Sequence, residues 1–321
     1  MLQLEKAWYS KHAILRCLLP LSWIYRGIIC IRRFILTTFV QQATQTPLIV
    51  VGNLTTGGVG KTPLVLAIAK FFKAQGKTVG IVSRGYKAKV QAFPYEVRPN
   101  DAADWVGDEP ALLAQRSGCP VVIAPRRREA VRYLEEKYAP SVIISDDGLQ
   151  HYAMGRTLEI LVIDGTRGFG NGYCLPAGPL REPVSRLKSI DLKVVNGAEW
   201  LDAYSMHYEA LGFRHLQSGN RVNQTDLPKP LRFVTGIGNP QRFFQDLQAQ
   251  GLEGESYIFP DHHQFCEADL PWATGSVVMT EKDAVKCAAF AKLHWYVYEV
   301  QAQLSSNFWS QLQRIVPCVH S

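Results

Sequence analysis

The chain has 321 residues, of which 47% are hydrophobic, so it is long enough to bury a sizeable core and to form two domains. Its seven cysteines follow no C-x-x-C or Cys/His spacing, which argues against a disulfide framework and against a zinc site. The net charge of +7 is unevenly distributed: residues 6–95 contain thirteen Lys and Arg and no acidic residue, whereas residues 96–321 carry −5. A nucleic acid, an anionic membrane surface or an anionic substrate would each account for this distribution.

Residues 1–45 differ from the rest of the chain and predict an amphipathic, membrane-associated helix. Their apolar part is interrupted by four arginines: Arg16, Arg26, Arg32 and Arg33. The uncharged run at 17–25 is too short to cross a hydrocarbon core of about 30 Å, while Trp23 and Tyr25 favour the headgroup level. We expect one helix, or two broken near Pro20, in the membrane interface. A helix packed in an ordinary core and a spanning helix are the alternatives.

A glycine-rich motif follows the apolar strand at residues 47–51 and precedes an apolar helix. Its residues are Thr55, Thr56, Gly57, Gly58, Val59, Gly60, Lys61 and Thr62. Backbone N–H groups and the helix N-terminus of such a turn bind phosphate, so we expect these residues to bind ATP. Lys61 would contact the β- and γ-phosphates and Thr62 would ligate Mg²⁺. Thr55 replaces the usual first glycine, as in the variant loops of partition ATPases; a turn without a ligand is the alternative.

Polar side chains end the next strand, at residues 77–86, and open the helix that follows. Ser83, Arg84 and Tyr86 are candidates for substrate contact because ligands bind at the ends of parallel strands. Asp108 stands at a helix start, where an acid usually only stabilises the helix dipole. From the residues alone, that structural interpretation is the better one for Asp108.

A second nucleotide-related motif is the strand at residues 141–145, which ends in Asp146 and Asp147. An apolar strand that ends in Asp is typical of the Walker B motif, which supplies a carboxylate to Mg²⁺. Two adjacent acids repel each other, and a cation relieves that repulsion. We therefore expect both to lie at a metal site, and His151 to contact phosphate or substrate.

The remaining pattern alternates short apolar strands with helices. A Gly- and Pro-rich segment at 168–183 is long enough to be a functional loop, and Arg181 and Glu182 are its charged pair, of which Arg181 is a candidate for substrate contact. Asn196, at the end of a strand, is a candidate for adenine contact. This alternation predicts an α/β fold of the P-loop NTPase type, with a mostly parallel sheet and helices on both faces.

The strand–helix pattern weakens between residues 197 and 230, where we place a domain boundary. We expect a core domain at 46–225 and a smaller C-terminal α/β domain at 226–321. In the latter, Thr280 with Asp283 resembles a helix cap. Lys282, within the same motif, is equally compatible with a surface charge.

Eight motifs occur in order along the chain: V-G-N-L-T-T-G-G-V-G-K-T-P, S-R-G-Y, G-D-E-P, S-D-D-G-L-Q-H, D-G-x-R-x-F-G-N-G, L-P-A-G-P-L-R-E, D-H-x-x-F and M-T-E-K-D-A-V-K-C. Together with the N-terminal helix, they resemble the tetraacyldisaccharide 4'-kinase family of lipid A biosynthesis in Gram-negative bacteria, over essentially the whole chain. The resemblance implies an ATP- and Mg²⁺-dependent kinase that phosphorylates the 4'-hydroxyl of a tetraacylated glucosamine disaccharide 1-phosphate, the lipid A disaccharide precursor, to form lipid IVA. It also implies a monotopic protein on the anionic, cytoplasmic face of the inner membrane.

The resemblance changes the interpretation of several residues. Asp108, in G-D-E-P, matches the family's proposed catalytic base, and His262, in D-H, matches its partner from the second domain. Asp146 and Asp147 match the acidic pair at the metal site, with which Glu182 of L-R-E is also associated. Since phosphoryl transfer is mainly positioning and charge neutralisation, a carboxylate held by a histidine is enough to orient the hydroxyl and accept its proton. Closure of the two domains would assemble this site and exclude water.

Three other functions compete with the kinase. A membrane-associated partition or positioning ATPase normally carries a signature lysine near the start of its P-loop, where this chain has Thr55 and Thr56. A soluble P-loop ligase leaves the N-terminal helix unexplained. A nucleic-acid-binding protein is disfavoured, since no aromatic–basic recognition motif accompanies the charge. We expect the protein to act as a monomer.

Overall fold

The computed structural model describes residues 7–10 and 13–316, so residues 1–6 and 11–12 of the predicted N-terminal segment lie outside the described part. The strands are β1 (Leu48–Gly52), β2 (Val79–Ser83), β3 (Tyr95–Val97), β4 (Val121–Ile123), β5 (Val142–Ser145), β6 (Leu158–Asp164), β7 (Leu192–Asn196), β8 (Tyr204–His215), β9 (Arg221–Val222), β10 (Leu231–Thr235), β11 (Glu255–Ile258), β12 (Ser276–Thr280) and β13 (Trp295–Leu304). The α-helices are α2 (Leu19–Ile35), α3 (Lys61–Ala74), α4 (Ala103–Val106), α5 (Asp108–Ser117), α6 (Arg127–Tyr138), α7 (Pro240–Ala249), α8 (Glu281–Cys287) and α9 (Ser306–Ile315).

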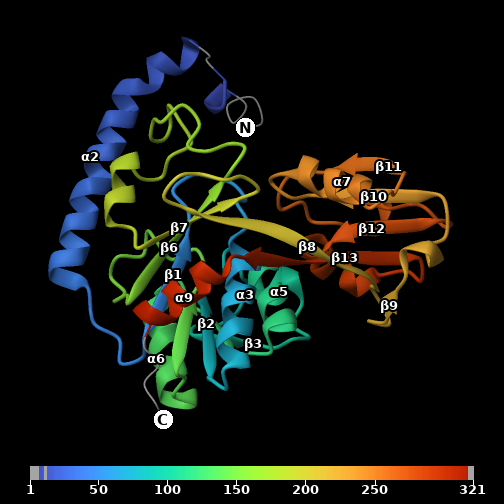
Figure 1. Ribbon diagram of the computed structural model, residues 1–321, viewed down its shortest axis with the longest axis horizontal. Coiled ribbons are helices and arrows are strands. Elements are labelled where there is room, and N and C mark those ends of the chain that lie inside the picture. Colours follow the sequence, from blue (N-terminus) through green and yellow to red (C-terminus); the bar gives the residue numbers. More distant parts are fainter. Residues whose placement is uncertain (1–6, 11–12, 317–321) are drawn as a thin grey trace.

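These strands form one continuous sheet in the order β11-β10-β12-β13-β8-β7-β6-β1-β5-β2-β4-β3, with β9 beside β8 (Figure 1). Neighbouring strands are parallel except at three pairs: β3–β4, β8–β9 and β8–β13. Because β8 and β13 run antiparallel to each other, they join two sets of parallel strands that point in opposite directions. The predicted α/β class with a mostly parallel sheet is confirmed.

Successive side chains of β1 point to opposite faces of the sheet, and helices pack on both of these faces. Leu48 and Val50 belong to the core that contains Leu134 of α6, whereas Ile49 and Val51 belong to the core that contains α3 and α5. All of these β1 side chains are fully buried. In a strand that is buried on both faces, consecutive residues are apolar, as they are in β1.

We call the part of the structure built on β1 to β7 the first lobe and the part built on β10 to β12 the second lobe. Two separate hydrophobic clusters hold the second lobe, one around α7 and one around α8. After the second lobe, the chain returns to the first lobe, where Phe308 and Leu312 of α9 are buried in the core. The boundary expected between residues 225 and 226 stays a prediction.

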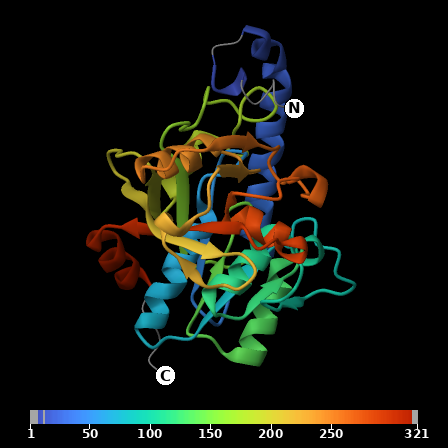
Figure 2. The same cartoon turned by 90° about the vertical axis from the view of Figure 1, so that its right-hand side faces the viewer.

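Helix α2 lies on the outside of the first lobe, on the side away from the second lobe (Figure 1, Figure 2). It begins directly after a 3₁₀ turn, Ala13–Leu18, and has Pro20 in its first turn, as expected from the fixed φ of proline. No helix in the described parts of the chain has the length and apolar character needed to cross a membrane.

The polarity of α2 is reversed relative to an ordinary surface helix. Two of its polar groups face the protein: the Ser22 hydroxyl donates to the Cys174 carbonyl at 2.7 Å, and the Tyr25 hydroxyl donates to the Arg181 carbonyl at 3.1 Å. Its large apolar side chains face outward and are exposed: Leu21, Trp23, Ile24, Ile28, Ile31, Phe34 and Ile35. A contiguous exposed apolar face of this kind is typical of a surface that contacts lipid or protein.

Candidate active site

The glycine-rich motif forms a strand–turn–helix, in which β1 leads into the loop and α3 begins at Lys61. Gly60 precedes the helix with φ +95°, in the left-handed region. A Cβ at this position would lie 2.3 Å from the Tyr208 hydroxyl and 2.5 Å from Asn196 Nδ2. Glycine is therefore required here both by the backbone conformation and by the close approach of the β7 and β8 side chains.

A cavity of about 200 Å³ lies over this turn, between the two lobes. Residues Gly58, Val59, Gly60, Lys61 and Thr62 line its P-loop wall, and residues of α5, α7, α8 and β13 form the other walls. Thr55, Thr56 and Gly57 are not part of the lining. Instead, the Thr56 N–H donates to the Pro179 carbonyl at 2.9 Å, which ties the start of the motif to the 168–183 loop.

The Lys61 ammonium lies beside the end of β5. Its Nζ is 3.3 Å from Asp147 Oδ1 and 3.2 Å from the Asn53 side-chain oxygen. Arg181, from the 168–183 loop, contacts the same carboxylate at 3.2 Å. Burial acts to raise the pKa of Asp147, but the charges of Lys61, Arg181 and Arg127 outweigh it and lower that pKa. Asp147 is thus ionised, and its carboxylate holds the ammonium of the P-loop lysine.

Asp146 is in a different environment, although it is adjacent in sequence. Its side chain is fully buried, and neither carboxylate oxygen has a hydrogen-bond partner among the described residues. Burial, together with the charges of Glu109 and Asp147, raises its pKa to about 7. A buried carboxylate without a partner, beside a P-loop, fits a divalent cation, which would replace the missing hydrogen bonds.

The site is not a preformed cage for a metal. Within residues 7–10 and 13–316, no group of three or more His, Cys, Asp and Glu side chains is arranged so that it could hold a metal ion. Glu182 is buried, and its two oxygens accept hydrogen bonds from Gln150 at 2.8 Å and from the Tyr152 hydroxyl. Mg²⁺ commonly uses one or two carboxylates and substrate phosphates, so this sparse set remains compatible with it. The role of Glu182 at a metal stays a prediction.

Asp108 and His262 meet across the cleft between the lobes. Asp108 is the first residue of α5 in the first lobe, and His262 follows β11 in the second lobe. His262 Nδ1 lies 3.2 Å from Asp108 Oδ2, and the His262 backbone has φ +60°. Burial acts to raise the pKa of Asp108, whereas the His262 hydrogen bond and the charges of Lys286 and Lys282 lower it below its usual value. Two residues 154 positions apart in sequence thus form a polar pair with an ionised carboxylate.

Three of the substrate candidates lie at the end of β2. Ser83 is buried, whereas Arg84 and Tyr86 are exposed. The Tyr86 ring meets His262 edge to face at 6.1 Å between centroids, which places it beside the Asp108–His262 pair.

His151 is half-buried near several arginines. Burial, with the charges of Arg127 and Arg156 among others, lowers its pKa to about 4, so the ring is neutral at pH 7. Arg181 contacts Asp147, the carboxylate that also holds the P-loop lysine, so it lies beside the expected phosphate site. The contacts of these residues with substrate remain predictions.

The wall of the P-loop cavity also contains residues that sequence patterns did not single out. Tyr208 of β8 and Arg242 of α7 both line it, and the Arg242 guanidinium lies 4.1 Å from the centre of the Tyr208 ring. Asn196 lies beside them; its amide donates to the Val59 carbonyl at 3.0 Å and accepts a hydrogen bond from Arg242. No motif marks Tyr208 or Arg242, because their proximity to the P-loop arises only from the packing of the lobes.

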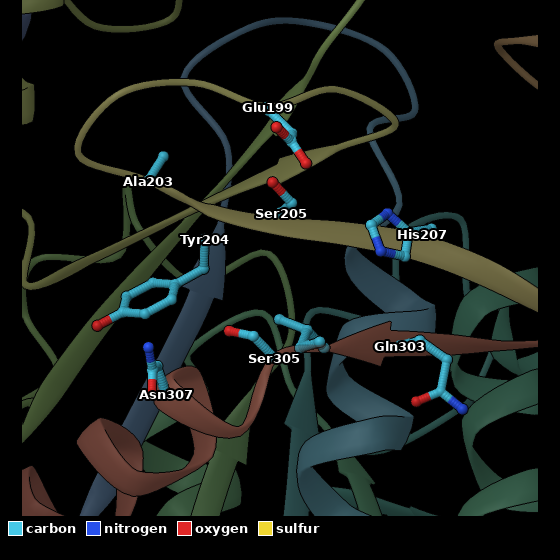
Figure 3. Close-up of a pocket in the computed structure, with 9 residues that line it drawn as sticks. Glu199, Ala203, Tyr204, Ser205, His207, Gln303, Ser305 and Asn307 are labelled. Carbon is cyan, nitrogen blue, oxygen red and sulfur yellow. The ribbon is translucent and has the colours of Figure 1, made fainter.

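A second cavity, of about 550 Å³, is an open groove where the ends of β8 and β13 meet α9 (Figure 3). Its wall contains the carboxylate of Glu199 and the ring of His207, and otherwise uncharged side chains such as Ser305 and Asn307. It has no Lys or Arg in its lining. An anion such as ATP is therefore better accommodated by the cavity over the P-loop.

Comparisons with known proteins agree with this geometry. The family model of tetraacyldisaccharide-1-P 4'-kinase matches residues 14–317. The tetraacyldisaccharide 4'-kinase of Legionella pneumophila (strain Lens) is 52% identical over 305 residues, which cover 95% of this chain and 94% of the relative. That of Alcanivorax borkumensis is 43% identical over 314 residues, covering 96% and 95% of the two chains.

A solved structure is similar over almost the same length. The crystal structure described as the "apo" form of LpxK from Aquifex aeolicus in complex with ATP matches with a TM-score of 0.81 and 28% identity, covering 94% of this chain and 99% of that one. These matches favour the kinase over the switch ATPase of the partition type. Since the family model and relatives of this identity span nearly the whole chain, the protein belongs to the tetraacyldisaccharide 4'-kinase family of lipid A biosynthesis.

Proposed function

We propose that this kinase binds ATP with its phosphates at residues 58–62 and transfers the γ-phosphate to a hydroxyl held at the Asp108–His262 pair. The acceptor is the 4'-hydroxyl of the tetraacylated disaccharide 1-phosphate, in keeping with the family. The observation that carries this proposal is the hydrogen bond between Asp108 and His262, which sets an ionised carboxylate at the mouth of the cleft that contains the P-loop.

In this reaction, Asp108 accepts the proton of the sugar hydroxyl as the hydroxyl oxygen bonds to the γ-phosphorus. The bond between the γ-phosphorus and the bridging oxygen breaks, and ADP leaves with that oxygen. Asp108 suits this role because its lowered pKa keeps it unprotonated at neutral pH. His262, within hydrogen-bond distance, orients the carboxylate and stabilises its charge.

Charge neutralisation on the phosphates falls to Lys61 and to Mg²⁺. Lys61 would exchange its contact with Asp147 for the β- and γ-phosphates when ATP enters. Asp146, Asp147, Thr62 and Glu182 are the proposed metal-side residues, and the unpartnered oxygens of Asp146 are the strongest support among them. Mg²⁺ held there would draw charge from the phosphate oxygens.

The purine and ribose would contact the aromatic part of the wall of the same cavity. Its wall combines Tyr208, Phe243 and Tyr298 with the amide of Asn196, so it offers both apolar rings and a hydrogen-bonding side chain. Binding there would require Arg242 to shift from its contacts with Asn196 and Tyr208. We propose that the 46–225 and 226–321 units close on the nucleotide through β8 and β13, which connect them.

The reversed polarity of α2 supports an anchor on the anionic, cytoplasmic face of the inner membrane. With its apolar side chains outward and Arg16, Arg26 and Arg32 nearby, the helix is suited to lie in the headgroup region. Its contacts with Cys174 and Arg181 connect this surface to the 168–183 loop beside the active site.

The decisive experiment is transfer of labelled phosphate from ATP to the purified tetraacyldisaccharide 1-phosphate by the full-length protein. Lys61→Ala should abolish transfer, because the ammonium that contacts the phosphates is lost. Brisk ATP hydrolysis by the unaltered protein without labelling of the lipid would contradict the proposed acceptor. Transfer by Lys61→Ala at the unaltered rate would contradict the proposed place of ATP.

A further inference from the structure

Lys282 is a cation in the active-site cavity to which no role has been assigned above. It lies in the first turn of α8, in the second lobe, and lines the same cavity as residues Gly58, Val59, Gly60, Lys61 and Thr62. Its side chain is 19% exposed, so the ammonium is largely enclosed by protein. The interpretation of Lys282 as a surface charge is therefore wrong.

Two carboxylates lie near the Lys282 ammonium, but neither is close enough to fix its position. Its Nζ lies 3.6 Å from Glu109 Oε1 in the first lobe and 3.6 Å from Asp261 Oδ1 in the second. Both distances exceed those of a hydrogen-bonded ion pair, which are about 2.7–2.9 Å. An ammonium shared loosely between two carboxylates can move toward a stronger anion at small cost in lost interactions.

Lys282 also lies near the Asp108–His262 pair. Its two partners, Glu109 and Asp261, are the chain neighbours of Asp108 and His262, respectively. The positive charges of Lys286 and Lys282 help to lower the pKa of Asp108, the proposed base. Burial acts to lower the pKa of Lys282 itself, but the surrounding carboxylates raise it, so Lys282 is charged at neutral pH.

A second basic side chain crosses the same interface and gives a useful contrast. Arg116 of α5 is bonded to Glu281 and lies 3.1 Å from Glu299, so it is firmly held between the lobes. It is not part of the cavity lining. Arg116 therefore serves as an interlobe ion pair, whereas Lys282 has access to a ligand.

We propose that Lys282 is a second catalytic lysine, which leaves Glu109 and Asp261 when ATP binds and contacts the γ-phosphate from the second lobe. Together with Lys61 from the first lobe, it would place the transferring phosphoryl group between two ammonium groups. Because charge spreads over the oxygens of this group during transfer, a cation aimed at them lowers the barrier. The proposal rests on the placement of the ATP phosphates at residues 58–62.

The test compares nucleotides that differ only in the γ-phosphate. Binding of ADP and of the β,γ-methylene analogue of ATP, each with Mg²⁺, is measured by titration calorimetry on the full chain and on Lys282→Met, which keeps the aliphatic stem. We expect affinity for the analogue to fall about tenfold, or about 1.4 kcal/mol, and affinity for ADP to change less than about twofold. The turnover number kcat should fall about 100-fold.

Arg116→Ala is the matched control, since it removes an interlobe cation that does not itself line the cavity, whereas its partner Glu281 does. It should leave both affinities within about twofold of the unaltered protein. Equal losses of ADP and analogue binding in Lys282→Met, no loss of either, or the same selective loss in Arg116→Ala would each overturn the proposal. If Lys282→Met is not folded by circular dichroism, Lys282→Gln is judged by the same criteria. Lys61→Ala with unchanged analogue binding would instead count against the placement of ATP.

Discussion

Replacing Asp108 by Asn is the most direct test of the proposed chemistry. The change is nearly isosteric and retains an oxygen that can accept the His262 hydrogen bond, now 3.2 Å long. It removes the negative charge and the capacity to take up a proton. The side chain is only 7% exposed, so water has little room to replace the lost carboxylate as a base.

The size of the effect follows from the role assigned to Asp108. General base catalysis contributes about 10²–10⁴ in rate, which corresponds to about 3–5 kcal/mol of activation free energy. The lowered pKa of Asp108 means that the base is already ionised at neutral pH, so none of this effect is masked by protonation. The KM for ATP should change less than about threefold, because residues 58–62 and Lys61 are untouched.

The assay is initial-rate transfer of labelled phosphate from ATP to the disaccharide lipid in mixed micelles, with both substrates varied. Asp104→Asn is the matched control, since Asp104 lies in the preceding helix, α4, and is exposed. A kcat for Asp108→Asn within about threefold of the unaltered protein would refute the assignment of the base. An equal loss in Asp104→Asn would show that the effect is a general change of this region's charge.

Three further predictions concern the loop, the helix and pH. Gly60→Ala should weaken nucleotide binding, measured by calorimetry, because alanine is strained at φ +95° and its Cβ would displace the Tyr208 and Asn196 side chains. Gly172→Ala, with nothing within 4 Å, is the control for a positive-φ glycine, and binding by Gly60→Ala equal to that of the unaltered protein would contradict this reasoning. The double variant Ile28→Glu with Ile31→Glu should lower binding to anionic vesicles about tenfold, measured by sedimentation. The control, Gln248→Glu with Gln313→Glu, makes the same change of charge on exposed residues away from α2. Equal losses in both double variants would mean that net charge alone governs binding. His151 has a pKa of about 4 in the folded protein and about 6.5 when unfolded, so the folded state loses stability as the pH falls from 6.5 to 4. His151→Gln should flatten the dependence of the thermal unfolding midpoint on pH across this window. An unchanged pH profile would contradict the lowered pKa.

Local patterns in the sequence were sufficient to predict the features that depend on local geometry. Gly60-Lys61-Thr62 after an apolar strand predicts a P-loop, because the backbone conformation and the helix start are set by adjacent residues. The pairing of this loop with Asp146 and Asp147 is also predictable, since strands of a parallel sheet end at the same edge. In the structure, β1 and β5 are indeed parallel neighbours. The eight ordered motifs were enough to identify the family.

The resemblance to the family paired Asp108 with His262, but only the tertiary structure shows the geometry with which the two lobes share one site. The contact between Asp108 and His262 spans 154 residues of chain and depends on the antiparallel joining of β8 to β13, which no local pattern encodes. The same joining brings Tyr208, Arg242 and Lys282 to the P-loop. Packing within the first lobe distinguishes Asp146 from Asp147: one carboxylate is buried without a hydrogen-bond partner, while the next is held by Lys61. Burial and long-range packing, rather than residue type, thus set the chemistry of this cleft.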